Sequence, residues 1–430
     1  YMAAMRLDIP SMIVTGGSMQ PGQYCGKTVV EADLDAARFS GASEEELMDM
    51  EDNVCPSFGA CPSMGTANTM QMLGEVLNLV LPGTSTIPAS DNAKLRKARE
   101  AGMCIVEMAK AGRKPSDLIT KEVLMNAIMF DMAVAGSTNA VLHILSYAYE
   151  LGIKLTLADF EKYAKEIPCI NAVVPSGPYT VVDFHYAGGV MNVMKMLESK
   201  LYTDVPSMYG NTWADMLSRV KAQENKVIHS LEKPLFNEPG LKILRGNLSP
   251  NGAIVRPTAV YDEVKYMKGK AKVFEGDRPA FEAIMAGEIV PGDIIVIRYE
   301  GCKGAPGMKE LMLSIDALIG LGLDKSVGLI SDARFSGFNY GAIIGHVSPE
   351  AYDGGNIALV ENGDEIVIDI PNGEVSMLVS EEELERRRAA WVCPPLKEEK
   401  GCLNIFAKMC RPAEEGGAMQ PWDLDAKFHR

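Results

Sequence analysis

A cysteine-containing loop that leads directly into a helix is the segment whose residue types point most clearly to chemistry. Cys55 and Cys61 flank a short stretch of Pro, Gly and other small residues, so the backbone there can wrap closely around a bound group. Apolar residues recur at helical spacing over 70–80, and the Pro-Gly pair at 82–83 is expected to end the helix. A helix N-terminus therefore points at the cysteine loop.

The exposed N–H groups and the positive dipole end of such a helix favour a thiolate nearby. This placement suits either a reactive cysteine or a cysteine bound to a metal or a cluster. A buried structural cysteine is the alternative, and for an isolated cysteine it is the better interpretation.

A loop rich in glycine at 301–307 is followed by Glu310, whose carboxylate could bind a cation. The pattern predicts a strand over 293–298, then this loop, and then a helix over 309–319. Glu310 would lie in the first helical turn. There it could ligate a hard cation such as magnesium, or it could only satisfy the helix dipole.

A serine in the segment 330–337, Ile-Ser-Asp-Ala-Arg-Phe-Ser-Gly, is the second chemical candidate in this half of the chain. Ser336 follows an expected strand and is flanked by Arg334 and Gly337. It could be a helix N-cap, as most such serines are. No Gly-x-Ser-x-Gly elbow surrounds Ser336, so it is not a standard hydrolase nucleophile.

A polar run, Ser137, Thr138 and Asn139, interrupts a long apolar pattern over 121–149. Hydroxyl and amide groups are costly to bury unless they are hydrogen bonded. We therefore expect Ser137 or Thr138 to cap a helix over 140–150, and the run is also a candidate for ligand binding.

The composition indicates a soluble globular protein with more than one domain. Of the 430 residues, 47% are hydrophobic, which is enough to bury large cores. Nine cysteines are scattered without a disulfide framework, and no signal-like or membrane-length apolar run occurs. These features predict a cytoplasmic location and no membrane partner. A formal net charge of -15 disfavours nucleic acid as a partner, whereas a small carboxylate could still bind in a local basic pocket.

The texture of the chain changes near residue 240, which predicts two domains followed by a tail over 416–430. Residues 1–240 have helical patterns, including single helices over 34–51, 90–111 and 212–223. They also contain an expected buried strand, Ser11 to Thr15, that ends in a Gly-Gly turn as in parallel α/β sheets. Residues 241–415 alternate short β-type runs with Asn-Gly turns. The expected strands span 241–244, 253–256, 271–273, 293–298, 326–331, 356–359, 365–370 and 374–378.

Several motifs resemble those of the dihydroxy-acid dehydratase and 6-phosphogluconate dehydratase family. The segment 55–70, CPSFGACPSMGTANTM, is similar to the cluster-ligand segment of that family. VTGGSMQPG at 14–22, AGSTNAVLH at 135–143 and the two motifs around Glu310 and Ser336 extend the resemblance over almost the whole chain. The resemblance implies an α/β fold: an N-terminal α/β/α layered domain followed by a β-barrel-like, swivelling β/β/α C-terminal domain.

The resemblance also implies roles for individual residues. Cys61 would ligate an iron–sulfur cluster, either 2Fe-2S or 4Fe-4S, whereas Cys55 would be structural. Glu310 would ligate magnesium, and Ser336 would be the catalytic base. A serine is a poor base in water, so nearby positive charge is needed to stabilise its alkoxide. The residues expected to bind the substrate are Ser137, Thr138, Asn139 and Arg334.

The implied reaction is the dehydration of a 2,3-dihydroxy acid to a 2-keto acid by a hydro-lyase that forms a homodimer or a dimer of dimers. The segments 297–304 and 334–337 favour a dihydroxy acid of branched-chain amino acid biosynthesis, whereas 331–334 and 304–308 favour a sugar acid. Tyr1 opens as the middle of a helix, so we expect the chain to begin inside a longer motif. The family carries further cluster and metal ligands upstream, and a non-catalytic relative is therefore the rival hypothesis.

Overall fold

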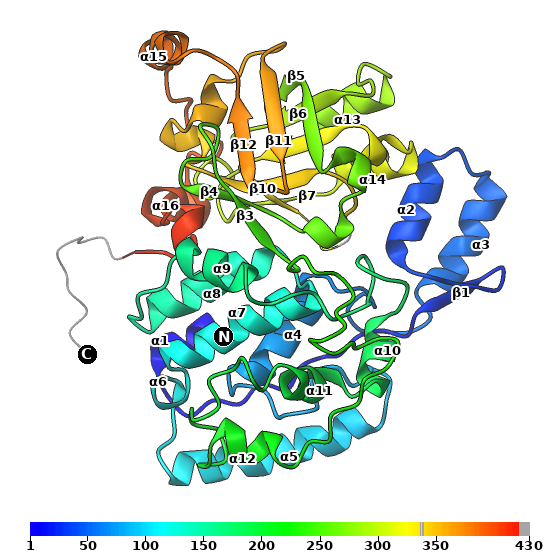
Figure 1. The fold of residues 1–430 in the computed structure, drawn as a ribbon, viewed down its shortest axis with the longest axis vertical. Helices are drawn as coiled ribbons and strands as arrows, with labels where there is room; N and C mark the ends of the chain where they lie inside the picture. Colours follow the sequence, from blue (N-terminus) through cyan, green and yellow to red (C-terminus); the bar gives the residue numbers. More distant parts are fainter. Residues whose placement is uncertain (336, 338, 421–430) are drawn as a thin grey trace. The chain divides into compact units, whose positions relative to one another are not determined.

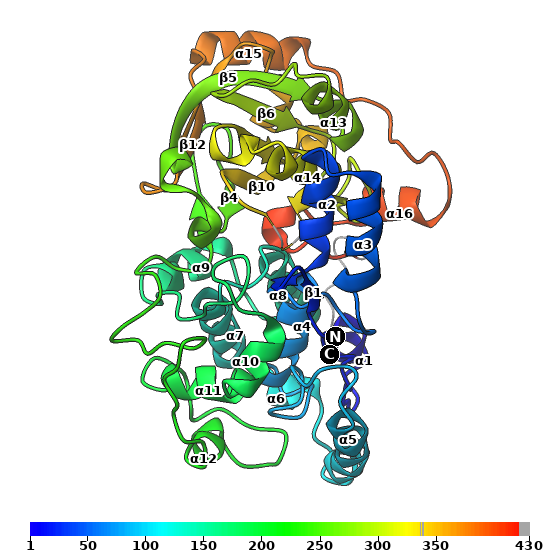
Figure 2. The ribbon, with the colours of Figure 1, turned by 90° about the vertical axis from the view of Figure 1, so that its right-hand side faces the viewer.

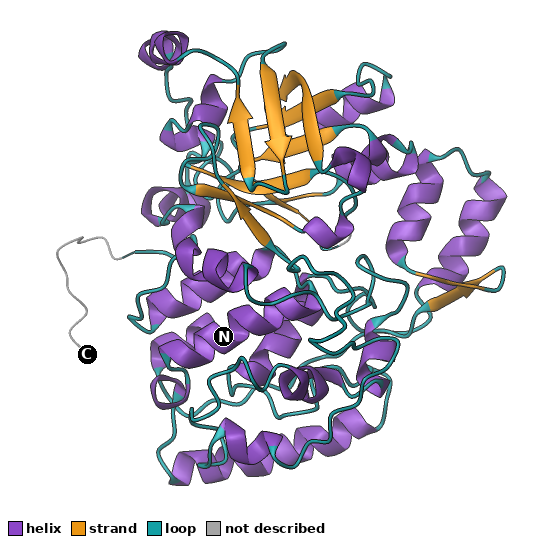
Figure 3. Ribbon diagram, viewed as in Figure 1, coloured by secondary structure: helices purple, strands orange, loops and turns teal. Residues whose placement is uncertain are grey.

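The structure is a computed structural model that describes residues 1–335, 337 and 339–420. The chain divides into two compact units, an N-terminal unit, Tyr1–Leu241, and a C-terminal unit, Lys242–Arg430 (Figure 1). Each unit has its own secondary structure, predominantly helical in the first and sheet-based in the second (Figure 3). The predicted fold class, a mixed α/β protein with a β-rich C-terminal domain, is confirmed.

The described part of the N-terminal unit contains one small β-hairpin, β1 Gly22–Tyr24 and β2 Lys27–Val29, among helices. Its helices are α1 Met2–Leu7, α2 Glu31–Phe39, α3 Glu44–Val54, α4 Thr66–Val76, α5 Ala93–Lys110, α6 Pro115–Leu118, α7 Lys121–Val134, α8 Asn139–Glu150, α9 Leu157–Ala164, α10 Val181–Tyr186, α11 Gly189–Met196 and α12 Trp213–Leu217.

Helix α7 is the centre of the N-terminal unit. It contacts α4, α8, α9 and α11, and nearly all of its side chains from Val123 to Val134 are buried. A helix that is apolar on all sides is stable only when neighbours cover it completely. This requirement explains why α4 and α8, which directly follow the segments with the candidate site residues of this unit, pack against α7.

Three expectations for the N-terminal unit are wrong in detail. Residues 11–15 form extended chain and not a buried strand; Ile13 donates one hydrogen bond to Leu79, and Val14 is 51% exposed. The single helix expected over 34–51 is two helices, α2 and α3, because Gly41 adopts a positive φ of 87° between them. Helix α12 is much shorter than the expected 212–223.

The C-terminal unit is built on an eight-stranded mixed sheet with the order β12-β11-β5-β6-β8-β10-β4-β3. Strands β5, β6, β8 and β10 are parallel to one another, and the remaining pairs are antiparallel. The strands are β3 Lys242–Leu244, β4 Gly252–Val255, β5 Tyr266–Phe274, β6 Asp293–Ile297, β8 Gly328–Ser331, β10 Ile343–Ser348, β11 Glu365–Asp369 and β12 Glu374–Met377.

The two edges of this sheet approach each other, so the sheet is nearly a closed barrel. An isolated parallel bridge joins Arg245, just after β3, to Glu374 of β12. Two backbone hydrogen bonds of 2.8 Å support the bridge, from Arg245 to Gly373 and from Val375 to Arg245. Strand β5, the longest strand, curves strongly around the sheet (Figure 2). Closure satisfies edge groups that would otherwise need other partners.

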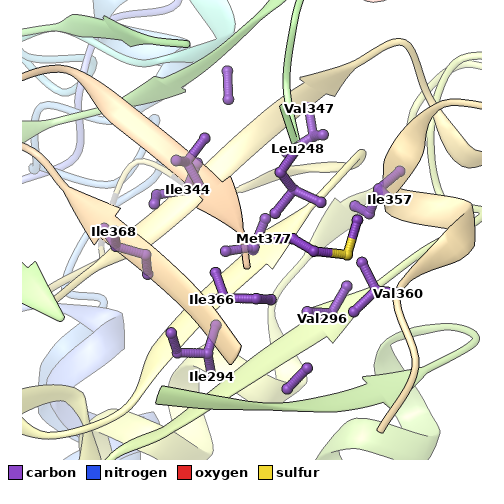
Figure 4. Packing of buried hydrophobic residues seen from close by; sticks show 14 of the residues in the cluster. Leu248, Ile294, Val296, Ile344, Val347, Ile357, Val360, Ile366, Ile368 and Met377 are labelled. Atoms are coloured by element: carbon purple, nitrogen blue, oxygen red, sulfur yellow. The ribbon is translucent and has the colours of Figure 1, made fainter. Parts of the chain in front are cut away.

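Aliphatic side chains fill the interior of the C-terminal unit. Ile294, Val296, Ile344, Ile366 and Ile368 are each 0% exposed and meet in one cluster (Figure 4). Each fully buried side chain of this size contributes about 1.5–3 kcal/mol. They come from three different strands, β6, β10 and β11, so the cluster fixes the alignment of the sheet.

Helices and 3-10 turns complete the C-terminal unit. The helices are α13 Asp277–Met285, α14 Leu313–Gly320, α15 Glu381–Ala390 and α16 Gly401–Met409. The 3-10 turns are η1 Pro257–Ala259, η2 Asp262–Val264, η3 Leu323–Lys325, η4 Ala351–Asp353, η5 Asn356–Leu359 and η6 Ala413–Glu415. The strand expected over 356–359 is therefore wrong, and β10 is a strand that the sequence pattern did not predict.

The start of α14 is capped by a side chain from another helix. The Asp277 carboxylate accepts N–H hydrogen bonds from Met312, Leu313 and Ser314 at 3.1–3.2 Å, and the Ser314 hydroxyl donates to it at 2.6 Å. Asp277 is 3% exposed, so water cannot replace it readily.

We predict that Asp277→Ala lowers the free energy of unfolding by about 2–3 kcal/mol, because several buried or partly buried donors lose their acceptor together. The matched control is Ser380→Ala at the exposed N-cap of α15, where the hydroxyl accepts from Glu383 N at 3.3 Å; the expected cost there is about 1 kcal/mol. Denaturant unfolding of the whole chain measures both. An equal or larger loss for Ser380→Ala would contradict this assignment.

Candidate functional site

The cysteine loop of the N-terminal unit is paired with the Gly-Gly turn that the sequence analysis singled out. Ala60 N donates to Gly17 O at 2.9 Å, and Met19 N donates to Ala60 O at 2.7 Å. Gly59 has a φ of 130°, and a Cβ there would lie 2.4 Å from Met19 N. Only glycine fits this approach, so Cys61 follows a backbone that is held tightly against 17–19.

Helix α4 fixes the far side of the same loop through one side chain. Asn68 Nδ2 donates to Cys61 O at 2.6 Å and to Ser63 O at 2.9 Å. Gln71, one turn further on, donates to Asn68 Oδ1 at 3.1 Å and accepts from Gly17 N at 2.6 Å. Two amide side chains thus link the helix, the cysteine loop and the Gly-Gly turn.

The polar run at 137–139 meets the start of the same helix. The hydroxyls of Ser137 and Thr66 are 2.9 Å apart, and Asn139 Nδ2 donates to Thr66 Oγ1 at 2.8 Å. Ser137 Oγ also accepts from Asn139 N at 3.2 Å, which confirms the predicted capping of the following helix α8 by Ser137. Thr138 makes no side-chain capping bond. The polar run therefore packs against the N-terminus of α4, although about 70 residues separate the two in sequence.

The environment of Cys61 differs from the expected one. Burial raises the pKa of the Cys61 thiol, and a hydrogen bond with Ser63 Oγ at 3.3 Å only partly offsets that effect. Proximity to the helix start therefore does not by itself produce a thiolate, whereas a bound metal cation would. Cys55 is exposed at the C-terminal end of α3, so it has no place in a core.

A pocket of about 420 Å³ opens beside this loop within the N-terminal unit. Its lining includes Thr15, Gly16, Gly17, Ala60 and Gln71. Because Gly17, Ala60 and Gln71 also form the hydrogen bonds that hold the cysteine loop in place, the pocket offers room for a group next to the Cys61 segment.

The C-terminal unit brings Glu310 and Arg334 together by a route that differs from the expected one. Glu310 lies in a two-residue strand, β7 Glu310–Leu311, that pairs in parallel with β9 Arg334–Phe335. The expected helix over 309–319 is wrong at its start, because the backbone pairs with β9 first and α14 begins only at Leu313. Arg334 Nη1 lies 3.7 Å from Glu310 Oε1, and Arg334 Nε donates to Met308 O at 2.5 Å.

Ser336 lies outside the described residues. The next residue in sequence, Gly337, is hydrogen bonded to an arginine that the sequence analysis missed. Arg256, which is 3% exposed, donates to Gly337 O at 2.6 Å. Arg256 directly follows β4, and its position among apolar residues at a strand end is the signal that could have marked it. Its guanidinium brings a second cation to the segment of Arg334.

Within the described residues, no three His, Cys, Asp or Glu side chains gather as the ligands of one metal ion would. Cys61 and Glu310 are therefore each considered as a single ligand. The half-buried thiol on a loop held close to a pocket fits a soft iron ligand, and the half-buried Glu310 carboxylate fits a hard cation. In the part of the chain that the structure describes, no helix is both long and apolar enough to span a bilayer.

Comparison with known proteins defines the class of protein. The N-terminal domain model of the dihydroxy-acid/6-phosphogluconate dehydratases matches residues 1–216, and the C-terminal domain model matches residues 226–417. The chain therefore belongs to the dihydroxy-acid/6-phosphogluconate dehydratase family, as its motifs predicted.

The three relatives described next are all named dihydroxy-acid dehydratase. The chain is 43% identical to the dihydroxy-acid dehydratase of Clostridium novyi over 430 residues, which cover 97% of this chain and 77% of that protein. It is 44% identical to the dihydroxy-acid dehydratase of Methanosarcina barkeri over 424 residues, 97% of this chain and 76% of that protein. The enzyme of that name from Pyrococcus abyssi is 42% identical, with 97% and 77% covered.

We predict that Asn68→Ala loosens the cysteine loop, because the carbonyls of Cys61 and Ser63 lose their shared donor. Alkylation of the Cys61 thiol, followed by peptide mass spectrometry, should accelerate about 10-fold, the equivalent of one lost hydrogen bond. Asn53→Ala is the control, since Asn53 only donates to Asp49 O on an exposed helix. Equal rates for Cys61 in wild type and Asn68→Ala would contradict the tethering role.

Proposed function

We propose that this chain is a hydro-lyase that dehydrates a 2,3-dihydroxy carboxylic acid to a 2-keto acid, as dihydroxy-acid dehydratases of branched-chain amino acid biosynthesis do. The observation that carries the proposal is the match of 42–44% identity over 97% of the chain to relatives of that name. The same relatives weigh against the sugar-acid alternative. A small-molecule substrate, a cytoplasmic location and a homodimer are parts of the same proposal.

The proposal assigns a cofactor ligand to each unit. Cys61 would hold an iron–sulfur cluster through its thiolate, and Glu310 would hold magnesium through its carboxylate. When bound, these groups would supply Lewis acids that ease departure of the C3 hydroxyl and raise the acidity of the C2 proton. The Gly17–Ala60 pairing and the Asn68 tether support this assignment, because a ligand that is fixed in advance loses less entropy on binding.

The proton chemistry is assigned to residues of the chain itself. Ser336 would take the C2 proton, and Arg334 would stabilise the negative charge that develops. Arg256 supports this role, since its guanidinium binds the carbonyl of Gly337, the residue after Ser336. Two cations along one short segment address the main objection to a serine base, its high pKa.

The polar run 137–139 contributes to substrate binding in the proposal. Ser137 and Asn139 are both 0% exposed and hydrogen bonded to Thr66, so they would act by orienting the start of α4. Thr138, whose hydroxyl does not cap α8, is the member best suited to contact the substrate directly.

The first test concerns the cluster. The full-length protein, purified without oxygen, should be coloured and contain iron; Cys61→Ser should remove both, whereas the exposed Cys55→Ser should keep them. Absorption spectra and iron analysis make the measurement. A colourless wild-type preparation without iron would sink the assignment.

The second test concerns the reaction and its base. Ser336→Ala should keep the cluster spectrum yet lose turnover by about 100-fold or more, the usual contribution of a general base. Exchange of the substrate C2 proton with deuterated solvent should disappear as well. A branched dihydroxy acid and an aldonic acid are assayed side by side, and preference for the aldonic acid would reverse the substrate assignment.

Two other serines provide the controls for Ser336→Ala. Ser331 Oγ accepts from Ala333 N at 3.0 Å, and Ser348 Oγ donates to His346 O at 3.1 Å, so both hydroxyls have structural bonds. Their alanine variants should lose far less turnover. Near-normal turnover of Ser336→Ala would show that the base lies elsewhere.

A further inference from the structure

Three loops of the C-terminal unit leave the same edge of its sheet. Strands β6, β8 and β10 are parallel neighbours, so their carboxyl ends lie together. The loop over 298–309 follows β6 and leads to Glu310, the segment after β8 contains Arg334, and the segment after β10 contains Glu350. Because such loops have few backbone partners of their own, their N–H groups need other acceptors.

One buried carboxylate, that of Asp332, receives N–H groups from two of these loops. Its Oδ1 accepts from Glu300 N at 3.0 Å, and its Oδ2 accepts from Tyr299 N at 3.1 Å and from Ala351 N at 2.9 Å. Asp332 itself belongs to the third loop, two residues before Arg334, and it is 0% exposed. A single side chain thus links all three segments.

A second buried carboxylate, Glu350, holds the next part of the Glu310 loop. Glu350 Oε1 accepts from Lys303 N at 3.0 Å and from Gly304 N at 2.9 Å, and Oε2 lies 3.1 Å from Lys303 N. A Cβ at Gly301 would lie 2.6 Å from Oε2. The loop backbone therefore passes so close to this carboxylate that no side chain fits at residue 301.

The remainder of the loop is connected to Arg334. Met308 O accepts from Arg334 Nε, and the Glu310 backbone pairs with Arg334 in the two-stranded β7–β9 ladder. The position of Glu310 relative to Arg334 therefore depends on the path of the loop from Tyr299, which Asp332 fixes at its beginning. The reaction chemistry assigned above does not use Asp332, although its carboxylate is buried among the loops of that site.

We propose that Asp332 is a positioning residue that holds the Glu310 loop and the Arg334–Phe335 strand in one fixed arrangement. This inference rests on the proposed function, since it assigns metal binding to Glu310. Asp332 acts through its acceptor oxygens on backbone N–H groups and touches neither substrate nor cofactor. Loss of the link would leave Glu310 present but mobile, and ordering it would then cost part of the magnesium affinity.

The two carboxylates should respond differently to replacement by their amides. In Asp332 both oxygens accept N–H groups from different residues, so an Asn must direct an NH2 group at a backbone donor. In Glu350, Oε1 accepts from both loop residues and Oε2 only shares the Lys303 N–H, so a Gln with its amide oxygen at the Oε1 position keeps an acceptor for both donors. Burial raises the pKa of Glu350 to about 8, so Gln also matches its protonated form at neutral pH.

The experiment compares Asp332→Asn, Glu350→Gln and wild type as the complete, cofactor-loaded enzyme. Asp332→Asn should raise the magnesium concentration for half-maximal activity by about 10- to 100-fold, the equivalent of losing charged hydrogen bonds. The cluster spectrum should be unchanged, and high magnesium should restore most of the turnover. Glu350→Gln should stay within about 3-fold of wild type, less than one typical hydrogen bond.

Hydrogen exchange provides a readout that does not depend on activity. In Asp332→Asn the peptide containing Tyr299 and Glu300 should exchange faster, whereas peptides of the sheet core around Ile344 should be unchanged. Uniformly faster exchange, or unchanged exchange at 299–300 with normal magnesium dependence, would overturn the proposal. If Asp332→Asn does not fold, Ala351→Pro removes one donor to Asp332 and should give a smaller effect in the same direction.

Glu310→Gln separates failure of this inference from failure of the proposed function. If Glu310→Gln leaves magnesium dependence unchanged, the metal assignment is wrong, and the exchange rate at 299–300 in Asp332→Asn still decides whether Asp332 holds the loop. If Glu310→Gln abolishes the response while Asp332→Asn behaves as wild type, the metal assignment stands and the positioning role of Asp332 is rejected.

Discussion

Acceptance of backbone N–H groups by buried carboxylates is the interaction on which the candidate site depends. Loops that carry functional residues lack the ladders that satisfy helices and strands, and a buried N–H without a partner costs about 1–3 kcal/mol. Asp277 satisfies the start of α14, and Asp332 and Glu350 satisfy the loops beside it. In the N-terminal unit Glu75, which is 0% exposed, accepts from Gly83 and Ser85 after α4. At each of these turns the carboxylate supplies the hydrogen-bond acceptor that a helix or a neighbouring strand would otherwise provide.

The parts of the fold that follow from local signals could be predicted from the sequence. The Ser380 cap of α15 needs only a serine and the N–H groups that follow it, and the structure contains that bond. The Asn372-Gly373 turn between β11 and β12 needs only a residue with positive φ, and Gly373 has a φ of 73°. Most of the short β-type runs are strands for the same reason, because their pattern and turns are local.

Features that depend on distant partners could not be predicted. The apolar run at 11–15 resembles a strand, but the described residues include no neighbouring strand that pairs with it, so it remains extended chain. The sequence pattern placed Glu310 in a first helical turn. Its backbone instead pairs with Arg334 in a short ladder, and no local pattern encodes that pairing. The tether from Asn68 to Cys61 and the acceptor role of Asp332 are equally non-local. The resemblance named candidate residues, but only the structure revealed what holds their backbones.

The buried carboxylates of the C-terminal unit are coupled through their charges. Burial raises the pKa of Asp332 to about 6, but N–H groups from three residues limit the rise, so Asp332 is largely ionised at neutral pH. Burial and, second to it, the negative charge of Asp332 together raise the pKa of Glu350 to about 8. Two anions this close would repel each other at low dielectric, so ionisation of Asp332 keeps Glu350 protonated. The ionised carboxylate, the stronger acceptor, is therefore that of Asp332, which links three loops. The neutral Glu350 holds its part of the loop without adding a second desolvated charge.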